Sequence, residues 1–457
     1  MCSWKSYAVG LIAGTLITAA GPAHFSIAPA NAQSGQPGLA TIAVEGDPAP
    51  AEVGGTFANI ESCSLGESGE VAFSAELSGS SVTSALFLNS GGTNRVILRS
   101  GDGTPAGGTF TGFHEVDAAD GDFILFRATL GGIAPAEGVF LWYSQTGVQT
   151  IQLAGDQTNN RYPGMTYKSF SQLSVMAEDS TSQFGVNYAF VATLNEGGEV
   201  IVWNQLNSKS PGLDEEITGQ YSFEAESPRE VVDHFVISRL GNLGLIFVAQ
   251  YHRRHGNKEF DRPFYSQSTL RDDPTLTEGL KTSLGKLQQM DVPVAVDYDA
   301  QIFFSAALVK NGQASRAILT ESIQGFSPFP LAALLVTGDE APGHRDQTIV
   351  DIGPPVANPV RNPPRIRLPS ALASEVQLSG GEKAIWVAIL TPGTNGAEFT
   401  INARLELLGG ATGDPIHQLL TSMRPVKLTD TGKLLISGSV WDGGSARNGL
   451  FLLDGLF

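Results

Sequence analysis

The chain repeats itself at intervals of roughly 55 residues, and this repeat limits the folds open to it more than any other feature. A large apolar residue, any residue and then a small residue recur together seven times within apolar segments. The copies are Phe73-Ser74-Ala75, Phe126-Arg127-Ala128, Phe190-Val191-Ala192, Phe247-Val248-Ala249, Phe304-Ser305-Ala306, Trp386-Val387-Ala388 and Ile436-Ser437-Gly438. We interpret each copy as part of the second strand of one repeat unit.

A second series alternates with the first and marks the end of each unit. Gly followed by Asp closes an apolar run five times, and we call these dipeptides the Gly-Asp turns. They are Gly46-Asp47, Gly101-Asp102, Gly155-Asp156, Gly338-Asp339 and Gly413-Asp414, with Gly219-Gln220 and Gly285-Lys286 as degenerate copies. Gly permits a positive φ and Asp accepts hydrogen bonds from nearby backbone N–H groups, so the pattern predicts turns. A calcium site is the alternative, which we disfavour because one Asp per unit does not converge on one ion.

Each unit has the pattern of four short strands. In residues 47–102 we predict strands at 55–63, 70–77, 85–88 and 95–98, separated by Gly- and Ser-rich turns. Short apolar strands at this spacing, without a long helical period, predict an all-β fold. Four strands per unit are typical of a β-propeller blade.

The two ends of the chain complement each other. The last unit has strand patterns at 433–437 and 450–453 but lacks a fourth strand, whereas residues 39–44 form a spare strand before the first unit. We predict that these ends pair and complete a seventh four-stranded blade. The predicted fold is a seven-bladed β-propeller over residues 33–457, closed by pairing of the N-terminal strand with the last blade, which hides the edge strands.

Residues 1–32 are predicted to be a signal peptide. Lys5 precedes an apolar run at 8–20 that is too short to span a bilayer comfortably, and Ala30-Asn31-Ala32 provides the small residues of a cleavage site. A retained membrane anchor is the alternative. Removal of the segment leaves Cys63 as the one cysteine, which we expect to be a small buried apolar residue rather than a nucleophile. We expect a periplasmic or secreted protein with no membrane span after signal removal.

The composition argues against two classes of main partner. The formal net charge is −18, which argues against nucleic acid and against an anionic membrane surface. An apolar share of 42% is enough to build a core and excludes wholesale disorder.

Several segments resemble a known repeat family. The segment Leu65-Gly66-Glu67-Ser68-Gly69-Glu70-Val71-Ala72-Phe73 and the turn Gly46-Asp47-Pro48-Ala49-Pro50 carry this resemblance. They resemble the bacterial exported tandem NxxGxxxF (NxxGxxxAF) repeat family, and the turns are similar to those of TolB-like β-propellers, which are mostly scaffolds. The resemblance covers most of the chain after residue 32, consists of structural residues and implies no catalytic residue.

The densest basic cluster is His252-Arg253-Arg254-His255-Gly256-Asn257-Lys258, which we call the basic segment. We predict a loop after the second strand of the fourth unit, on the propeller face that usually binds ligands. Arg side chains recognise carboxylates and phosphates, so His252, Arg253, Arg254 and His255 are our candidate ligand-binding residues. The alternative, a solvated loop whose charges pair with Glu259 and Asp261, is the more common role of a charge run.

One acidic pair could support catalysis. In a presumed first strand, His114 and Val116 should share one face, and Glu115 and Asp117 the other. First strands line the centre of a propeller, where two carboxyls could act as acid and base on a sugar. Other units lack companion residues at these positions, so we favour a structural role.

The sequence therefore predicts an exported, non-catalytic binding or scaffold propeller that recognises a protein or glycan ligand. The alternative is a carbohydrate-active lyase or hydrolase at the mouth of the central channel, and a surface or matrix component is a third possibility. We assign no catalytic residue, no metal ligand and no cofactor.

Overall fold

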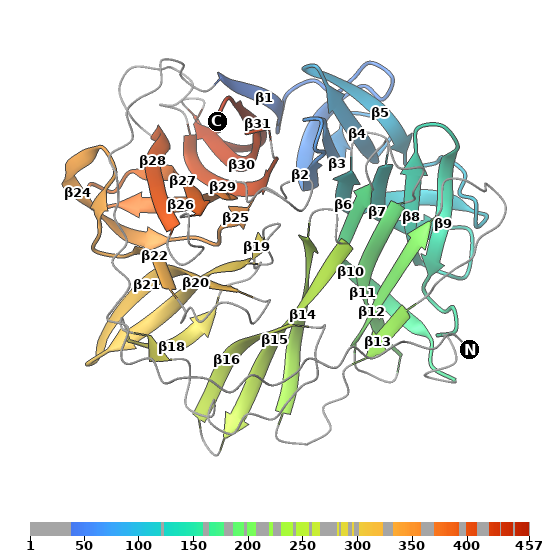
Figure 1. Cartoon of the computed structure of the whole chain (residues 1–457). Coiled ribbons are helices and arrows are strands. Elements are labelled where there is room, and N and C mark those ends of the chain that lie inside the picture. The colour runs from blue at the N-terminus through green and yellow to red at the C-terminus, as the bar shows by residue number, and fades with distance from the viewer. Residues whose placement is uncertain are drawn as a thin grey trace.

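The computed structural model describes residues 38–456, except for 120–122, 159–163, 178–185, 196–198, 207–218, 223–229, 241–243, 256–257, 266–280, 283–284, 291–294, 297–300, 323–331, 358–369, 393–398, 409–419, 430 and 442–443. Within these residues the regular secondary structure consists of β-strands alone, and the strands pair in antiparallel sheets (Figure 1). The all-β prediction is confirmed.

Four sheets have four strands each. The first contains β2 (Thr56–Leu65), β3 (Val71–Ser78), β4 (Ser84–Ser90) and β5 (Thr93–Arg99). The second contains β6 (Thr109–Ala119), β7 (Phe123–Gly131), β8 (Glu137–Tyr143) and β9 (Gly147–Leu153). The third contains β10 (Tyr167–Ala177), β11 (Val186–Leu194), β12 (Glu199–Leu206) and β13 (Gly219–Ser222). The fourth contains β29 (Leu420–Leu428), β30 (Leu434–Trp441), β31 (Ala446–Asp454) and β1 (Gly38–Val44).

Three further sheets lie between β13 and β29 in the sequence. One contains β14 (Glu230–Leu240), β15 (Gly244–His255) and β16 (Lys258–Tyr265). The next contains β17 (Lys281–Thr282), β18 (Gly285–Met290), β19 (Ala295–Val296), β20 (Gln301–Lys310), β21 (Gln313–Ser322) and β22 (Ala332–Val336). The last contains β23 (Glu340–Ala341), β24 (His344–Ile352), β25 (Val356–Ala357), β26 (Ser370–Leu378), β27 (Lys383–Pro392) and β28 (Phe399–Leu408).

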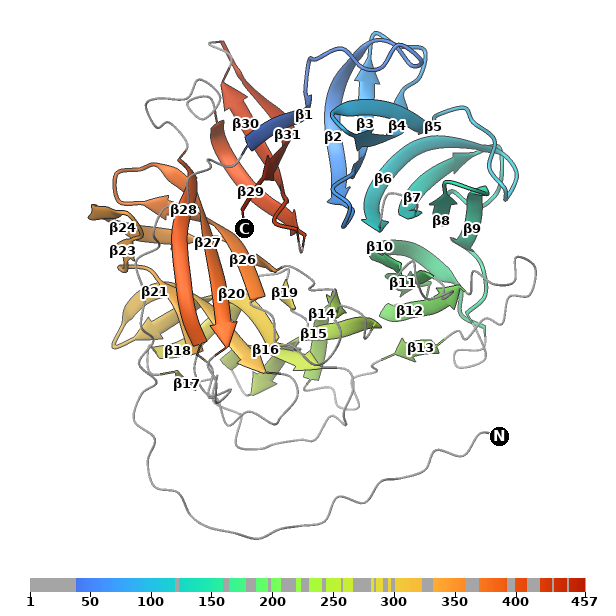
Figure 2. The same ribbon diagram turned by 45° about the horizontal axis from the view of Figure 1, so that its top comes forward.

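The sheets are arranged around a common centre. Figure 1 shows one strand of each sheet nearest this centre, and Figure 2 shows the same arrangement from a tilted view. Successive inner strands contact each other in the order β2, β6, β10, β14, β19, β25 and β29, and β29 also contacts β2. We call these seven the inner strands.

The N-terminal strand β1 completes the sheet that the end of the chain begins. It pairs antiparallel with β31, with Leu39 opposite Leu453 and Val44 opposite Gly449. The backbone N–H of Glu45 then donates to the carbonyl of Asn448 at 2.9 Å. This is the pairing that the sequence predicted between residues 39–44 and 450–453, and it covers the edge of β31 that would otherwise lie open.

The core lies between neighbouring sheets. Phe110, Phe113, Phe126 and Phe140 pack together with rings 5.1–5.9 Å apart, against Leu86 from the preceding sheet. Each of these side chains is fully buried. Burial of one such side chain contributes about 1.5–3 kcal/mol, so this apolar cluster stabilises both its own sheet and the contact with the preceding one.

Two predictions about the repeat were wrong. Trp386 was predicted on the second strand of its sheet. It lies on β27, which pairs with β26 and β28 and is the third strand counted from β24. The degenerate copies Gly219-Gln220 and Gly285-Lys286 begin strands β13 and β18 instead of forming turns. Both lack the Asp carboxylate that closes the other turns.

Candidate functional site: a polar network on the inner strands

The inner strands β2, β6, β10 and β29 share a backbone irregularity. In each of them the pairing with the next strand shifts register twice. Such bulges leave backbone groups without a partner inside their own sheet, and so does the open edge of a strand that pairs on one side only. Side chains from the neighbouring inner strand bond several of these groups.

Glu115 and Asp117 of β6 bond the backbone of β10. Glu115 accepts the N–H groups of Gln172 and Leu173 at 3.0 and 2.8 Å, and Asp117 Oδ2 accepts that of Val175 at 2.8 Å. Gln172 has a φ of 53°, a conformation that costs a non-glycine residue roughly 1–2 kcal/mol. The two bonds from Glu115 therefore hold a strained bulge in place.

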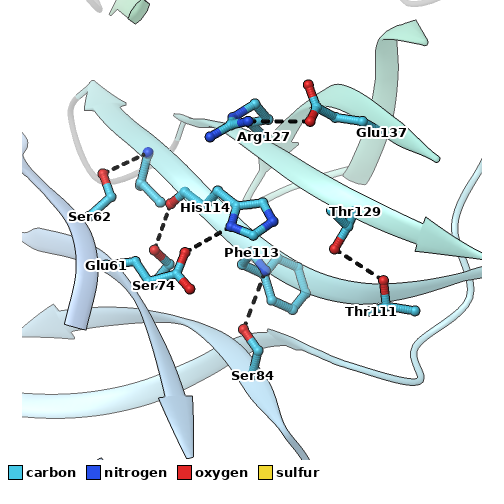
Figure 3. A network of polar contacts seen from close by, with 11 residues as sticks. Glu61, Ser62, Ser74, Ser84, Thr111, Phe113, His114, Arg127, Thr129 and Glu137 are labelled. Atoms are coloured by element: carbon cyan, nitrogen blue, oxygen red, sulfur yellow. Dashed lines mark hydrogen bonds and ion pairs between the residues drawn. The ribbon is translucent and has the colours of Figure 1, made fainter. Parts of the chain in front are cut away.

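Two serines of β2 make the same type of bond to β6. Ser62 Oγ accepts the N–H of Val116 at 3.0 Å, and Ser64 Oγ accepts that of Ala118 at 3.2 Å. Figure 3 shows this junction, in which Ser74 also donates to the carbonyl of His114 at 2.6 Å. Side chains two residues apart on one inner strand thus accept hydrogen bonds from the backbone of the next inner strand.

A largely buried ion pair connects three inner strands. Lys427 Nζ of β29 lies 3.2 Å from Asp117 Oδ1, and the two side chains are only 15% and 14% exposed. The ammonium also donates to Ser64 Oγ at 3.2 Å and to the carbonyl of Ala118 at 3.0 Å. Ser64 in turn donates to Asp117 Oδ1 at 2.5 Å. We call Lys427, Ser64 and Asp117 the axial triad.

A second polar pair lies on the same strands. His114 Nδ1 is 2.8 Å from Glu61 Oε2 of β2, and both side chains are partly exposed (Figure 3). On the other side of the β6 sheet, Arg127 pairs with Glu137 at 3.2 Å, and Glu137 also accepts the N–H of Phe170 at 3.0 Å. These contacts again join one sheet to the next.

The environment of Glu115 favours a structural role for its carboxyl. Burial raises the pKa of Glu115, while the Leu173 and Gln172 N–H groups and Arg127 oppose this rise. Backbone N–H groups donate to the carboxyls of both Glu115 and Asp117. The structural interpretation of the acidic pair is therefore favoured over acid–base catalysis.

The Gly-Asp turns have one repeated geometry. Gly46, Gly101, Gly155 and Gly338 have φ values of 87°, 96°, 91° and 99°. The carboxylates of Asp102, Asp156 and Asp339 accept the N–H three residues earlier, at 2.9–3.0 Å. Asp47 instead binds Arg447 at 3.0 Å. These contacts account for the turns, and Gly413-Asp414 lies outside the described residues.

The basic segment forms a hairpin rather than the predicted loop. Residues 252–255 end β15, and β15 pairs with β16 up to His255 opposite Lys258. The register places His252 opposite Asp261 and Arg254 opposite Glu259, whereas Arg253 is opposite Phe260. The strands are longer than predicted because their cross-strand pairing continues into the charged residues. Gly256 and Asn257 lie outside the described residues.

The remaining predictions concern single features. Cys63 is a free thiol, partly buried rather than fully buried as predicted, that packs against the apolar cluster of the first sheet. Burial raises its pKa to about 12, opposed by the charge of Arg424, so its predicted apolar role is supported. Residues 1–32, the predicted signal peptide, lie outside the described residues.

The described part of the chain holds no cluster of three or more His, Cys, Asp or Glu residues that could bind a metal ion. No helix in that part is long and apolar enough to cross a membrane.

Sequence reasoning missed Lys427, Ser62, Ser64 and Glu61. A signal for them exists, because Ser64 and Asp117 are 53 residues apart and Ser64 and Lys427 are 363 apart, so all three occupy one position of the repeat. Aligning the units by the Phe-x-Ala copies would have placed them together.

The comparisons with known proteins give one family of unknown function and solved structures of low similarity. Residues 11–218 match a family model described as "Family of unknown function (DUF7453)". No curated protein matches the sequence. Among solved structures, the WD40 domain of SCAP from fission yeast is 8% identical with a TM-score of 0.37, over 91% of this chain and 90% of that one. The subtype N11 neuraminidase-like protein of A/flat-faced bat/Peru/033/2010 (H18N11) is 10% identical with a TM-score of 0.33, over 81% of this chain and 96% of that one. The fucose-specific lectin from Aleuria aurantia is 11% identical with a TM-score of 0.27, over 78% and 97%. Likeness at this level assigns no ligand or activity to the present chain.

Proposed function

We propose that this chain is an exported, non-catalytic binding or scaffold protein, built as a closed seven-bladed β-propeller, that recognises a protein or glycan ligand. The sheets around one centre, the succession of inner-strand contacts from β2 back to β2 and the β1–β31 pairing support this architecture. Closure of the ring leaves short, protected strand edges, as a protein exposed to the cell exterior requires.

The observation that supports the non-catalytic assignment is that the acidic pair bonds the backbone of a neighbouring strand and an ammonium group. Glu115 and Asp117 are the acids that the sequence placed nearest the axis, and together they accept three backbone N–H groups and the Lys427 ammonium. An acid–base pair must be free to change its protonation state next to a substrate. Here a change of charge would instead loosen the junction between sheets.

The basic segment is our proposed ligand contact. The β15–β16 hairpin occupies the same place in its sheet as the β20–β21 hairpin in the next, where Lys310 is opposite Gln313. Arg254 stands opposite an acid, but Arg253 stands opposite Phe260. We therefore assign Arg253 the larger share of binding, to a carboxylate or phosphate on the ligand.

Export is part of the proposal. Residues 1–32 would direct the chain out of the cytoplasm and be removed before Gln33, which places the protein in the periplasm or the medium. Mass spectrometry of the protein recovered from cell fractions measures the N-terminal residue directly. Recovery in the cytoplasm with Met1 retained would contradict the proposal.

A glycan and peptide array probed with the exported protein tests the binding function. We expect binding that falls about tenfold or more in Arg253→Ala and less in Arg254→Ala, from loss of a charge-assisted hydrogen bond. Lys310→Ala, in the corresponding hairpin of the next sheet, is the matched control and should bind like the wild type. Strong binding that survives the double variant Arg253→Ala plus Arg254→Ala would rule out the basic segment.

A further inference from the structure

The axial triad has a counterpart three residues earlier on the same three strands. Glu61 and His114 are also 53 residues apart and lie in contact at 2.8 Å. The offset of 363 residues that links Ser64 to Lys427 leads from Glu61 to Arg424 on β29. Arg424, Glu61 and His114 therefore occupy one position of the repeat on neighbouring inner strands, as the triad does.

The Glu61 carboxylate determines which ring nitrogen of His114 carries the proton. A carboxylate can only accept a hydrogen bond, so Nδ1 must donate to Glu61 at 2.8 Å. In the neutral ring Nε2 is then an acceptor, and no described residue donates to it. The His114 side chain is 29% exposed, so a ligand can approach it.

Arg424 supplies a positive charge without an acidic partner. Five other described arginines pair with carboxylates, at Arg99–Asp102, Arg127–Glu137, Arg316–Asp351, Arg404–Glu406 and Arg447–Asp47. Arg424 is exposed, and within the described residues it has no ion-pair partner. Its charge lowers the pKa of the Cys63 thiol on β2, the strand that carries Glu61.

We propose that Arg424, His114 and Glu61 form a binding site for a small hydroxy acid at the inner strands. The Arg424 guanidinium binds the carboxylate through two parallel N–H donors, a geometry that suits this group. The Nε2 atom of His114 accepts a hydrogen bond from a hydroxyl of the same ligand, while Glu61 holds the ring in that tautomer. A ligand with a carboxylate alone satisfies half of the site.

This inference rests on the proposed binding function and names a ligand class for the centre of the ring, away from the basic segment. Its test uses separate variants and a separate probe. An array result that depends on Arg253 with no binding at the inner strands would reject this inference alone, and the reverse result would reject the basic segment alone.

The test is a ligand-observed NMR titration of the exported protein with D-glucuronate as the probe. Acetate, which has the carboxylate only, and D-glucose, which has hydroxyls only, are the ligand controls. We expect saturable binding of glucuronate, weaker binding of acetate and none of glucose. The dissociation constant for glucuronate should rise about tenfold or more in Arg424→Gln.

Three further variants separate ligand binding from folding. Arg345→Gln changes an exposed arginine on β24 and should bind like the wild type. Arg424→Lys keeps the charge without the paired donors, so its affinity should be intermediate. His114→Phe should weaken glucuronate but leave acetate unchanged. Equal affinity of Arg424→Gln and wild type for glucuronate, or no saturable binding by a wild-type protein with a cooperative thermal transition, would overturn the inference.

Discussion

Replacement of Lys427 by Met tests how the last sheet is fixed to the first two. The change removes the ammonium from Asp117, from Ser64 and from the carbonyl of Ala118, which lie 3.0–3.2 Å away. Met fills a similar volume and cannot donate a hydrogen bond. The Asp117 carboxylate, 14% exposed, is then left as a nearly buried charge without its counter-ion.

The expected loss of stability depends on which hydrogen bonds Asp117 keeps in the variant. Breaking a buried ion pair by removal of one partner costs about 3–5 kcal/mol. Asp117 still accepts from the Ser64 hydroxyl and the Val175 N–H, so part of its solvation is preserved. We therefore expect Lys427→Met to lower the free energy of unfolding by about 2–4 kcal/mol.

The assay is urea unfolding followed by far-ultraviolet circular dichroism, within a double-mutant cycle that adds Asp117→Asn. Because the two side chains interact directly, the double variant should be less destabilised than the sum of the single variants, by about 1–3 kcal/mol. Lys383→Met is the matched control. It breaks a pair with Glu375 inside one sheet, where the side chains are 40% and 23% exposed, and should cost about 1 kcal/mol or less.

Additive effects of Lys427→Met and Asp117→Asn would refute the reasoning, because they would mean that the two groups do not interact in solution. An equal loss in Lys383→Met would refute it as well, since the argument depends on burial and on the connection between sheets.

Four further outcomes follow from the structure. Removal of residues 38–44 uncovers the edge of β31, and analytical centrifugation should show association that the whole chain lacks. Gly101→Ala should cost about 1–2 kcal/mol in thermal unfolding through its φ of 96° alone, since no atom lies within 4 Å of the added methyl. Cys63, whose pKa is raised to about 12, should react with a disulfide reagent at pH 8 only after unfolding. Burial raises the pKa of Glu115 in the folded protein. The protonated carboxyl therefore contributes to the free energy of unfolding in full below about pH 4.5, and this contribution is lost as pH rises through the folded-state pKa. Glu115→Gln should therefore lack this fall in urea-unfolding free energy, and an identical pH profile in both proteins would contradict it.

The strand pattern was predictable because it depends on short-range signals. The predicted strands at 55–63, 70–77, 85–88 and 95–98 correspond to β2, β3, β4 and β5, which the structure places at 56–65, 71–78, 84–90 and 93–99. Alternating burial and Gly-rich turns are written into consecutive residues. The pairing of β1 with β31 was predictable for the same reason, since a spare strand and a missing strand are both visible in the sequence.

The errors have a different physical origin. A large residue followed by a small one marks a buried strand, but it does not give the rank of that strand in its sheet, as Trp386 on β27 shows. The basic segment was assigned to a loop from its charge, although cross-strand pairing carries β15 through His255. Charge alone does not end a strand when opposite charges face each other across the hairpin.

The polar network was beyond the sequence for a geometric reason. Simple alternation predicts that Glu115 and Asp117 share a face, which holds. It does not predict the register shift of β10 that leaves Gln172 and Leu173 as donors to Glu115. A bulge inserts one residue into a strand without a characteristic composition, so its position emerges only from the pairing of two strands.

The inner strands use the same two repeat positions for opposite purposes. At the position of Lys427, Ser64 and Asp117, every charge is opposed and the side chains are buried or nearly so, which stabilises the junctions between sheets. Three residues earlier, Arg424 is exposed and His114 keeps one nitrogen available. The repeat holds neighbouring units together at one position and can vary three residues earlier, because the side chains of Arg424 and His114 bond no described backbone group of a neighbouring inner strand. Ligand specificity in such a propeller is therefore expected where equivalent positions differ in charge and keep a polar group available, as Arg424 and His114 do.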